Sequence, residues 1–322
     1  MGRYPFITGV TEFLKKDGDY YEDITRKSYD RKLRFFGRIF EDLKKEGKVS
    51  STNPRKITED DIYAFVGTRV KDNIKPDTIL HDLSTLRLFL MNFGNNAVEK
   101  YKIKYRTRVP RAHHERREAL SEDVAIKIFK RAKTIDEDSW RLMEAYSLVS
   151  VAISTGLRPG ELRKLYRNNV RKDEDGYIIH AVHVKGEKTY GKPRDVPVLW
   201  DGGEILERYL VAREKKLKAW GKISDALFPP LRCNTPFLSS NAIIVLKKLV
   251  EDDLGIKFPL YICRHTFGQI GFDEGHQIHN ISRTMGHKTV KTTQEYYADK
   301  RQSAAVDEMR RLSRKTLAEG NE

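Results

Sequence analysis

The stretch WRLMEAYSLVSVAISTGLRPGEL, residues 140–162, decides the fold of the larger part of the chain. Residues 140–153 are apolar on nearly every side, which indicates a central buried helix and not a surface helix. This helix is expected to end at Gly156, because glycine breaks helices, and Pro159 suits the first turn of the next one. Arg158 is therefore predicted at a helix N-terminus, where backbone N–H groups favour anions and a guanidinium adds a planar fork for two oxygens.

On both sides of this stretch the sequence predicts more helices and one β-hairpin. Residues 177–184 and 194–199 alternate or run apolar with β-branched side chains, which is typical of two strands. Ser121, followed by two acidic residues, is expected to cap the first helix of this domain. Further helices are predicted at about residues 203–220, 240–250 and 264–272 and in the final twenty residues.

The N-terminal third predicts a bundle of three or four amphipathic helices. Apolar residues recur at helical spacing from Ser28, after Thr58 and from Thr78. Thr58 is a plausible N-cap, because three acidic residues follow it.

Residues 100–117 differ from both neighbouring parts of the chain. They are dense in Lys, Arg and His, contain Pro110 and show no sustained apolar period, which predicts a basic linker. The expected fold is therefore mainly α with a small antiparallel β-sheet. Its predicted parts are a helical domain at 1–99, the linker at 100–117 and a second domain at 118–322.

Composition points to a polyanionic partner inside the cell. The formal net charge is +15 and the basic residues are spread along the chain, which suits nucleic acid, although a lysine-rich surface also serves solubility. The two cysteines, Cys233 and Cys263, lack metal-ligand spacing and fit a reducing compartment. The sequence has no run of about eighteen apolar residues and begins without an apolar signal region, so a cytoplasmic protein is expected.

Four separated motifs carry the residues that could do chemistry. An arginine at a helix N-terminus or a lysine in a hairpin is, by itself, more often an ordinary surface charge. Only the ordered combination of motifs is specific enough to indicate a function. In chain order the motifs are Thr155-Gly-Leu-Arg158-Pro-Gly-Glu-Leu162, Val184-Lys185-Gly186, Tyr261-Ile-Cys-Arg264-His265-Thr266 and Met285-Gly-His287, with Thr292-Thr-Gln-Glu-Tyr296-Tyr297 after the last.

This ordered set resembles the tyrosine recombinase, or phage integrase, family over nearly the whole chain. The resemblance implies a SAM-like, DNA-binding core-binding domain followed by an integrase-type catalytic domain. It also implies a site-specific recombinase that cuts double-stranded DNA sites through a 3′-phosphotyrosyl link, acts as a tetramer, and uses no metal, ATP or other cofactor. The site residues that it implies are Arg158, Lys185, Tyr261, Arg264, His287 and the nucleophile Tyr296.

Position 261 departs from the family pattern, which usually has His three residues before the second Arg. A phenol can donate a hydrogen bond, but it is a poor base at neutral pH, so we expect activity that is slower or favoured at higher pH. The departure favours the integrase of a mobile element over an Xer-like chromosome or plasmid dimer resolvase. A DNA-binding protein of the same fold with weak or lost catalysis, and a type IB topoisomerase, stay open as alternatives.

Several neighbouring residues have competing interpretations. Tyr297 is the rival nucleophile to Tyr296, and His265 is expected to be a buried structural histidine. His276 and His279, on one helical side, suggest a metal site, but no third ligand follows at suitable spacing. Residues after Tyr296 offer a short apolar face that packs either on the same chain or, as in the family, on a neighbouring subunit: Ala304, Ala305, Val306, Met309 and Leu312.

Overall fold

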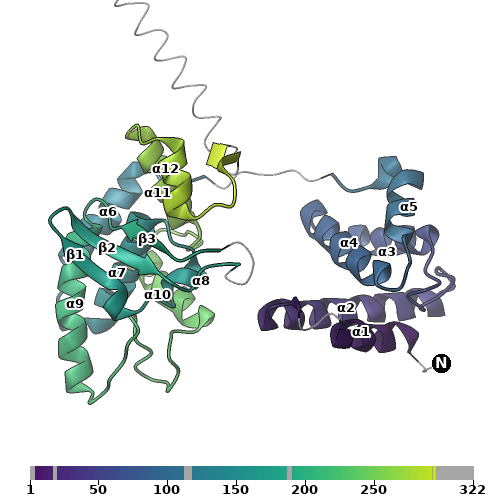
Figure 1. Ribbon diagram of the computed structural model, residues 1–322, viewed down its shortest axis with the longest axis horizontal. Helices are drawn as coiled ribbons and strands as arrows, with labels where there is room; N and C mark the ends of the chain where they lie inside the picture. Colours follow the sequence, from purple (N-terminus) through teal and green to yellow (C-terminus); the bar gives the residue numbers. More distant parts are fainter. Residues whose placement is uncertain (1–3, 17–19, 112–117, 187–190, 292, 295–322) are drawn as a thin grey trace, which may run out of the picture. The chain divides into compact units, whose positions relative to one another are not determined.

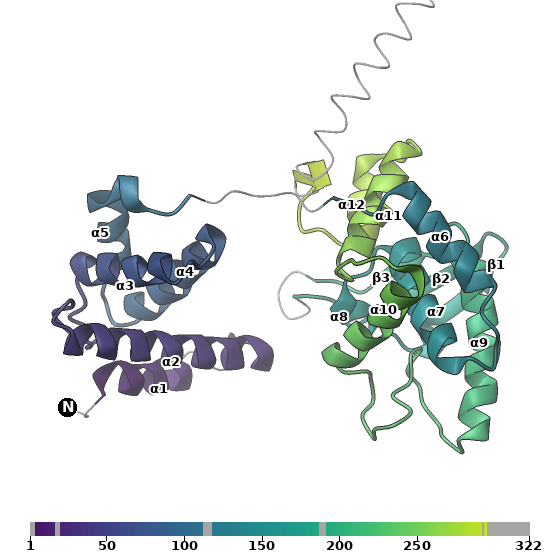
Figure 2. The same cartoon turned by 180° about the vertical axis from the view of Figure 1, so that it is seen from behind.

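The computed structural model describes residues 4–16, 20–111, 118–186, 191–291 and 293–294. The chain divides into two units, Met1–Glu115 and Arg116–Glu322. Figures 1 and 2 show the elements of each unit from opposite sides. Each unit has its own hydrophobic core, as the sequence predicts for a helical domain followed by a mixed one.

The first unit is a helical bundle around a core of phenylalanines. The Phe40 and Phe65 rings stack with their centroids 5.4 Å apart, and Phe6 lies 4.9 Å from Phe89. All four rings are fully buried, so they supply much of the apolar burial that stabilises the bundle. Its helices are α1 (Pro5–Lys16), α2 (Asp23–Lys45), α3 (Glu59–Lys71), α4 (Pro76–Met91), α5 (Ala97–Lys104) and the 3-10 turn η2 (Arg106–Arg108).

Helix α1 was not predicted, although its buried residues Phe6, Val10, Phe13 and Leu14 recur at helical spacing; its glycine and β-branched residues favour other conformations. The structure explains the glycine: a Cβ at Gly9 would lie 2.8 Å from the Pro54 side chain and 3.3 Å from Phe89. Close packing against neighbouring segments therefore stabilises α1 in spite of its weak intrinsic propensity.

Two polar features fix the bundle. Thr58 caps α3 as predicted, accepting from the Asp61 N–H while the Asp61 carboxylate accepts from the Thr58 N–H. Asp82 in α4, 1% exposed, pairs with Arg69 of α3 at 2.8 Å and with Lys32 of α2 at 3.0 Å. This ion triad, centred on the buried Asp82, links three helices.

The segment predicted as an irregular linker begins inside ordered structure. Helix α5 includes Lys100 to Lys104 and packs against α3 and α4. Tyr101 is fully buried, and its hydroxyl donates to the Arg108 carbonyl at 3.1 Å. Only Ala97, Val98 and Tyr101 of this short helix are buried, which is too few to give a sustained apolar period in the sequence.

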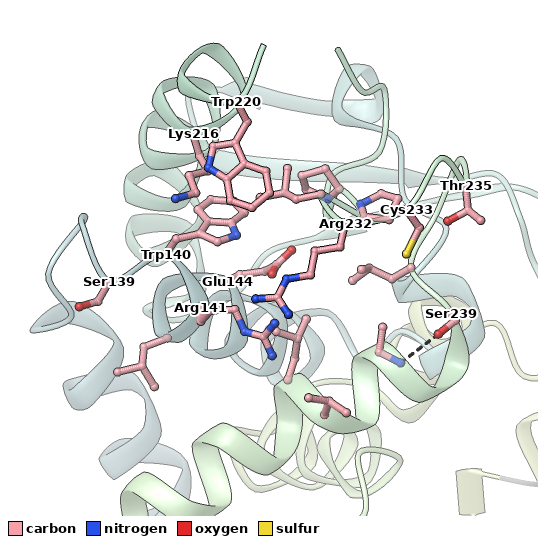
Figure 3. A pocket seen from close by; sticks show the side chains of 18 of the residues that line it. Ser139, Trp140, Arg141, Glu144, Lys216, Trp220, Arg232, Cys233, Thr235 and Ser239 are labelled. Carbon is pink, nitrogen blue, oxygen red and sulfur yellow. Dashed lines mark hydrogen bonds between the residues drawn. The ribbon is translucent and has the colours of Figure 1, made fainter. Parts of the chain in front are cut away.

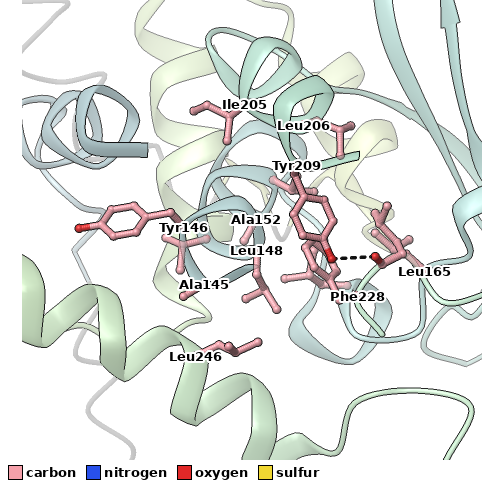
Figure 4. Packing of buried hydrophobic residues seen from close by; sticks show 14 of the residues in the cluster. Ala145, Tyr146, Leu148, Ala152, Leu165, Ile205, Leu206, Tyr209, Phe228 and Leu246 are labelled. Carbon is pink, nitrogen blue, oxygen red and sulfur yellow. Dashed lines mark hydrogen bonds between the residues drawn. The ribbon is translucent and has the colours of Figure 1, made fainter. Parts of the chain in front are cut away.

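The second unit is built around α7, the predicted central helix. It spans Trp140–Thr155, and only Arg141 and Leu142 lie outside its buried set. Figure 4 shows Leu148 and Ala152 packed among Tyr209 and Leu246, from helices on either side. The helices of this unit are α6 (Glu122–Lys133), α7, α8 (Pro159–Leu162), η3 (Arg167–Asn169), α9 (Gly202–Ala219), α10 (Ser240–Leu254), α11 (Ile262–Asp273) and α12 (Ile278–Met285).

A three-stranded antiparallel sheet, in the order β1-β2-β3, interrupts the helices. The predicted hairpin is confirmed as β2 (Gly176–Ala181) and β3 (Arg194–Pro197), with Ala181 opposite Arg194. Strand β2 ends before residue 184, so Lys185 follows it in a loop and is not the strand end that the sequence suggested. The edge strand β1 (Val170–Asp173) was not predicted, because three of its four residues are exposed.

The predicted fold class is confirmed, since the described chain is mainly helical with one small antiparallel sheet. Across the described ranges, none of the helices combines the length and apolar character needed to cross a membrane.

Candidate active site

Arg264, in the first turn of α11, is a buried side chain with two donor nitrogens that make no hydrogen bond to the described residues. The residue is 1% exposed, and its Nη1 donates to the Gly156 carbonyl at 2.7 Å. Its Nε and Nη2 have no hydrogen-bond partner among the described residues. Unpaired donors on a buried cation are costly, so this guanidinium is arranged to receive an acceptor from beyond the described residues.

Gly156 is required for that arrangement. It ends α7 in the left-handed conformation, with φ of 61°, and its carbonyl then faces Arg264. A Cβ at this position would lie 2.5 Å from the Phe267 ring. The predicted end of the helix is therefore also the anchor of the arginine.

Arg158 lies at the N-cap of α8, as predicted, and is held by two partners. Its Nη1 donates to Glu161 Oε1 at 2.8 Å, and its Nη2 donates to the Gly286 carbonyl at 2.9 Å. The expected anion site on backbone N–H groups does not form here, because α8 has four residues and the Arg158 N–H donates to Glu161 Oε2. Its contribution to anion binding is the guanidinium.

His287 follows directly after Gly286, which ends α12 with φ of 67°. Its Nδ1 lies 2.6 Å from the hydroxyl of Thr293, a fully buried residue. Burial first, and then the charges of Arg264 and Arg158, lower the pKa of His287 to about 3, so the ring is neutral at pH 7. In the tautomer whose Nδ1 accepts from Thr293, Nε2 carries the proton and can donate it to an oxygen.

Glu161 and Arg194 complete the cluster, and the sequence reasoning missed both as site residues. Burial alone would raise the pKa of Glu161, but hydrogen bonds and charge from Arg194 and Arg158 hold it below the usual value. Arg194 Nη2 donates to Glu161 Oε2 at 2.8 Å. A glutamate in a first helical turn and an arginine in a strand are common, so only the tertiary contact distinguishes these two.

The cluster carries excess positive charge. Burial, and then the charge of Arg158, lower the pKa of Arg264 to about 10, which leaves it protonated at pH 7. Three guanidinium groups against one carboxylate leave a surplus of two positive charges beside the neutral His287. An anion with several oxygens, such as a phosphate, fits this site.

Tyr261 and His265 lie next to the cluster on α11. Tyr261 is the N-cap residue, 36% exposed, and its ring meets His265 edge-on at 4.9 Å. His265 is 6% exposed, so the expected burial of this histidine is confirmed.

Lys185 is exposed in the loop after β2. The Gly191 N–H donates to the Gly186 carbonyl at 2.7 Å and closes the neck of this loop. Tyr296, the predicted nucleophile, and its rival Tyr297 lie outside the described residues, as does the apolar face that follows them.

The alternative metal site is not supported. Helix α11 ends at Asp273, Gly275 turns the chain with φ of 87°, and only His279 lies in α12, so His276 and His279 do not share a helix. In the part of the chain that the structure describes, no group of three or more His, Cys, Asp or Glu side chains could hold a metal ion.

A separate cavity of about 700 Å³ lies between α7, α9 and α10 (Figure 3). Trp140, Trp220 and Arg232 line it together with Glu144, whose pKa burial raises to about 8. None of the arginine-cluster residues line this cavity. The anion site is therefore not the hollow of Figure 3.

Comparison with known proteins shows similarity to phage integrases and tyrosine recombinases. The model of the phage integrase family matches residues 118–303. The chain is similar to tyrosine recombinase XerD of Listeria innocua, 22% identical over 84% of this chain and 86% of the relative. It is also similar to tyrosine recombinase XerC of Syntrophus aciditrophicus, 23% identical over 88% of this chain and 92% of the relative.

Two solved structures share the fold. The Tn1549 transposon integrase in complex with a circular intermediate DNA has a TM-score of 0.67 at 16% identity, over 96% of this chain and 99% of that one. The XerH site-specific recombinase bound to its difH substrate has a TM-score of 0.62 at 15% identity, over 90% of this chain and 80% of that one.

Proposed function

The chain belongs to the phage integrase family of tyrosine recombinases, and we propose that it cuts and rejoins DNA at specific sites through a covalent bond to Tyr296. The observation that carries this proposal is the pair of unpartnered, buried donors on Arg264, beside Arg158 and the neutral His287. These groups match the nonbridging oxygens of one phosphodiester.

The cluster suits the charge changes of phosphodiester exchange. Negative charge builds on the nonbridging oxygens while one oxygen attacks and another leaves in line. Arg264 Nε and Nη2 offer two donors. In the tautomer whose Nδ1 accepts from Thr293, His287 offers its Nε2–H as a third donor without carrying a positive charge. Donors fixed before reaction stabilise the transition state more than donors that must reorganise.

Two further roles complete the proposed reaction. The Tyr296 hydroxyl attacks phosphorus and forms a 3′-phosphotyrosyl link, which conserves the bond energy for rejoining. Lys185, exposed on the hairpin loop, donates a proton to the departing 5′ oxygen. The free 5′ hydroxyl then attacks the link in a partner duplex, which gives strand exchange.

The wider assembly follows from the same proposal. We place the protein in the cytoplasm, acting as a tetramer on two double-stranded DNA sites. The helical unit serves as the core-binding domain and the second unit as the catalytic domain, and the surplus positive charge of the chain supports phosphate contacts by both.

The proposed biological role is integration or excision of a mobile element, supported by the tyrosine at position 261. A second candidate, an Xer-type dimer resolvase, is supported by the Xer proteins that match most of the chain at 22–23% identity. An integrase leaves direct repeats on both sides of the element that carries its gene. A resolvase instead acts on a chromosomal site, and its loss leaves dimeric chromosomes that can be counted in dividing cells.

The central test is the capture of a covalent protein–DNA adduct. Purified protein is incubated with a plasmid carrying the DNA on both sides of its coding sequence, and the reaction is stopped with detergent. Tyr296→Phe should abolish the adduct, and Tyr297→Phe should retain it. The opposite pattern would transfer the nucleophile to Tyr297, and DNA binding without any adduct would favour the binding protein that has lost catalysis.

A further inference from the structure

Arg194 joins three elements of the second unit through one guanidinium. It opens β3, opposite Ala181 of β2, and its side chain is 13% exposed. Its Nε donates to the Thr284 carbonyl at 2.8 Å, and its Nη2 donates to the Met285 carbonyl at 3.1 Å and to Glu161 at 2.8 Å. The sheet is thereby fastened to the end of α12 and to α8.

The end of α12 depends on this side chain. The N–H groups of Gly286 and His287 donate to carbonyls further back in the helix, at Arg283 and Ser282. The Thr284 and Met285 carbonyls are instead satisfied by Arg194, whose positive charge also suits a helix C-terminus. A Cβ at Gly286 would lie 2.8 Å from the Arg194 guanidinium carbon, so a larger residue here would displace that guanidinium.

The groups that accept hydrogen bonds from Arg194 contact or adjoin the residues of the anion site. The Gly286 carbonyl accepts from Arg158, and His287 is the next residue along the chain. Glu161 accepts from Arg194 and Arg158 together. A displacement of Arg194 would therefore move two of the three side chains that face the anion, through two separate connections.

We propose that Arg194 is a positioning residue that holds the Lys185 hairpin in register with Arg158 and His287. Arg194 acts through Glu161 and the turn at Gly286 and does not itself contact the scissile phosphate. This inference rests on the proposed function. Arginine is required because three acceptors surround its planar fork, and lysine presents only one nitrogen.

The first test compares Arg194→Lys and Arg194→Gln with the parent on a DNA fragment on which the parent forms its adduct. Each variant should form the adduct roughly a hundredfold more slowly in a single turnover, because small misplacements of catalytic groups have effects of that size. Affinity for the same DNA should change little. The matched control is Arg171→Gln, which removes a sheet arginine that pairs with Asp195 and is 59% exposed; it should cleave like the parent.

A second readout needs no cleavage and uses the DNA-free protein. Histidine rings are labelled with ¹³C, and the His287 signal is identified by its loss in His287→Gln. In both Arg194 variants the His287 titration should move upward, toward the range of an ordinary histidine, as the ring loses its fixed burial near Arg264, Arg158 and His265. Arg171→Gln should leave it unchanged.

The outcomes separate this inference from the proposed function. A parent protein that forms no adduct, either with the DNA beside its gene or with the chromosomal site of a resolvase, refutes the recombinase, while the His287 titration still tests Arg194. Parent-like cleavage and titration in Arg194→Lys would overturn the positioning role, as would a loss of DNA affinity large enough to explain the whole effect. If neither variant folds, Gly286→Ala, which presses a methyl group on the same guanidinium, must give the slow cleavage and the shifted titration.

Discussion

Replacing Arg264 with methionine should slow cleavage at least a hundredfold and yet leave the DNA-free protein about as stable as the parent or more stable. The substitution keeps most of the side-chain volume and removes two buried donors that have no partner among the described residues. Each such donor costs about 1–3 kcal/mol, so about 2–6 kcal/mol of penalty is relieved, against about 1.5–3 kcal/mol for the lost hydrogen bond to Gly156. The net change should therefore lie between about 1 kcal/mol of destabilisation and about 4.5 kcal/mol of stabilisation.

The assay pairs urea unfolding of the DNA-free variant with single-turnover formation of the covalent adduct. Adduct formation should fall at least a hundredfold, since one preorganised donor contributes about 3–4 kcal/mol to the barrier. Arg213 is the matched control, because it is 2% exposed and donates to the carbonyls of Ser224, Ala226 and Leu227. Arg213→Met leaves these three carbonyls without this donor, at about 1–3 kcal/mol each, and should destabilise the protein by at least about 3 kcal/mol. If Arg264→Met were destabilised to the same extent, or still formed the adduct near the parent rate, the reasoning would be refuted.

Three further results are expected. The folded pKa of His287, about 3, lies below that of an exposed histidine, about 6.5, so between pH 6.5 and 3 the unfolded ring gains a proton that the folded ring does not. His287 therefore has no pH-dependent effect on stability above pH 6.5 and lowers the unfolding free energy increasingly as pH falls toward 3. The unfolding free energy of His287→Gln should depend less on pH in that window, and an unaltered slope would contradict the low pKa. Gly156→Ala, with positive φ and the Phe267 ring in the way, should lower the unfolding free energy by more than about 1–2 kcal/mol and slow adduct formation, and a parent-like melting temperature would show that the turn adapts. Tyr261→His should raise the cleavage rate near neutral pH relative to alkaline pH, whereas a pH–rate profile identical to the parent would show that Tyr261 takes no part in proton transfer.

Elements with a strong local pattern could be predicted from the sequence, and elements that depend on distant packing could not. Helix α7 follows from a stretch that is apolar on nearly every side, and the β2–β3 hairpin follows from runs of apolar and β-branched residues. The Thr58 cap follows from its acidic neighbours. Helix α1 contains Gly9, which makes sense only once Pro54 and Phe89 pack against it. Strand β1 is too short and too exposed to produce a pattern.

The same division applies to the candidate site. Arg158, Arg264 and His287 stand in motifs whose order resembles a known family, so they could be predicted together. The sequence could not show that Glu161 and Arg194 connect them, because that network joins residues 33 and 91 positions apart. Nor could the sequence show that two donors of Arg264 lie buried without a partner in the described chain, which depends on the surroundings of the whole side chain.

The anchoring of the two arginines by glycine carbonyls has a consequence for attempts to retarget such an enzyme by directed evolution. Main-chain oxygens of Gly156 and Gly286 hold the guanidinium groups, so randomising surface side chains elsewhere leaves both attachments untouched. Insertions or deletions within α7 or α12 are different, because they rotate the terminal carbonyl by about 100° per residue around the helix axis. Libraries that vary side chains while preserving the lengths of these two helices should retain far more active members than libraries that vary length.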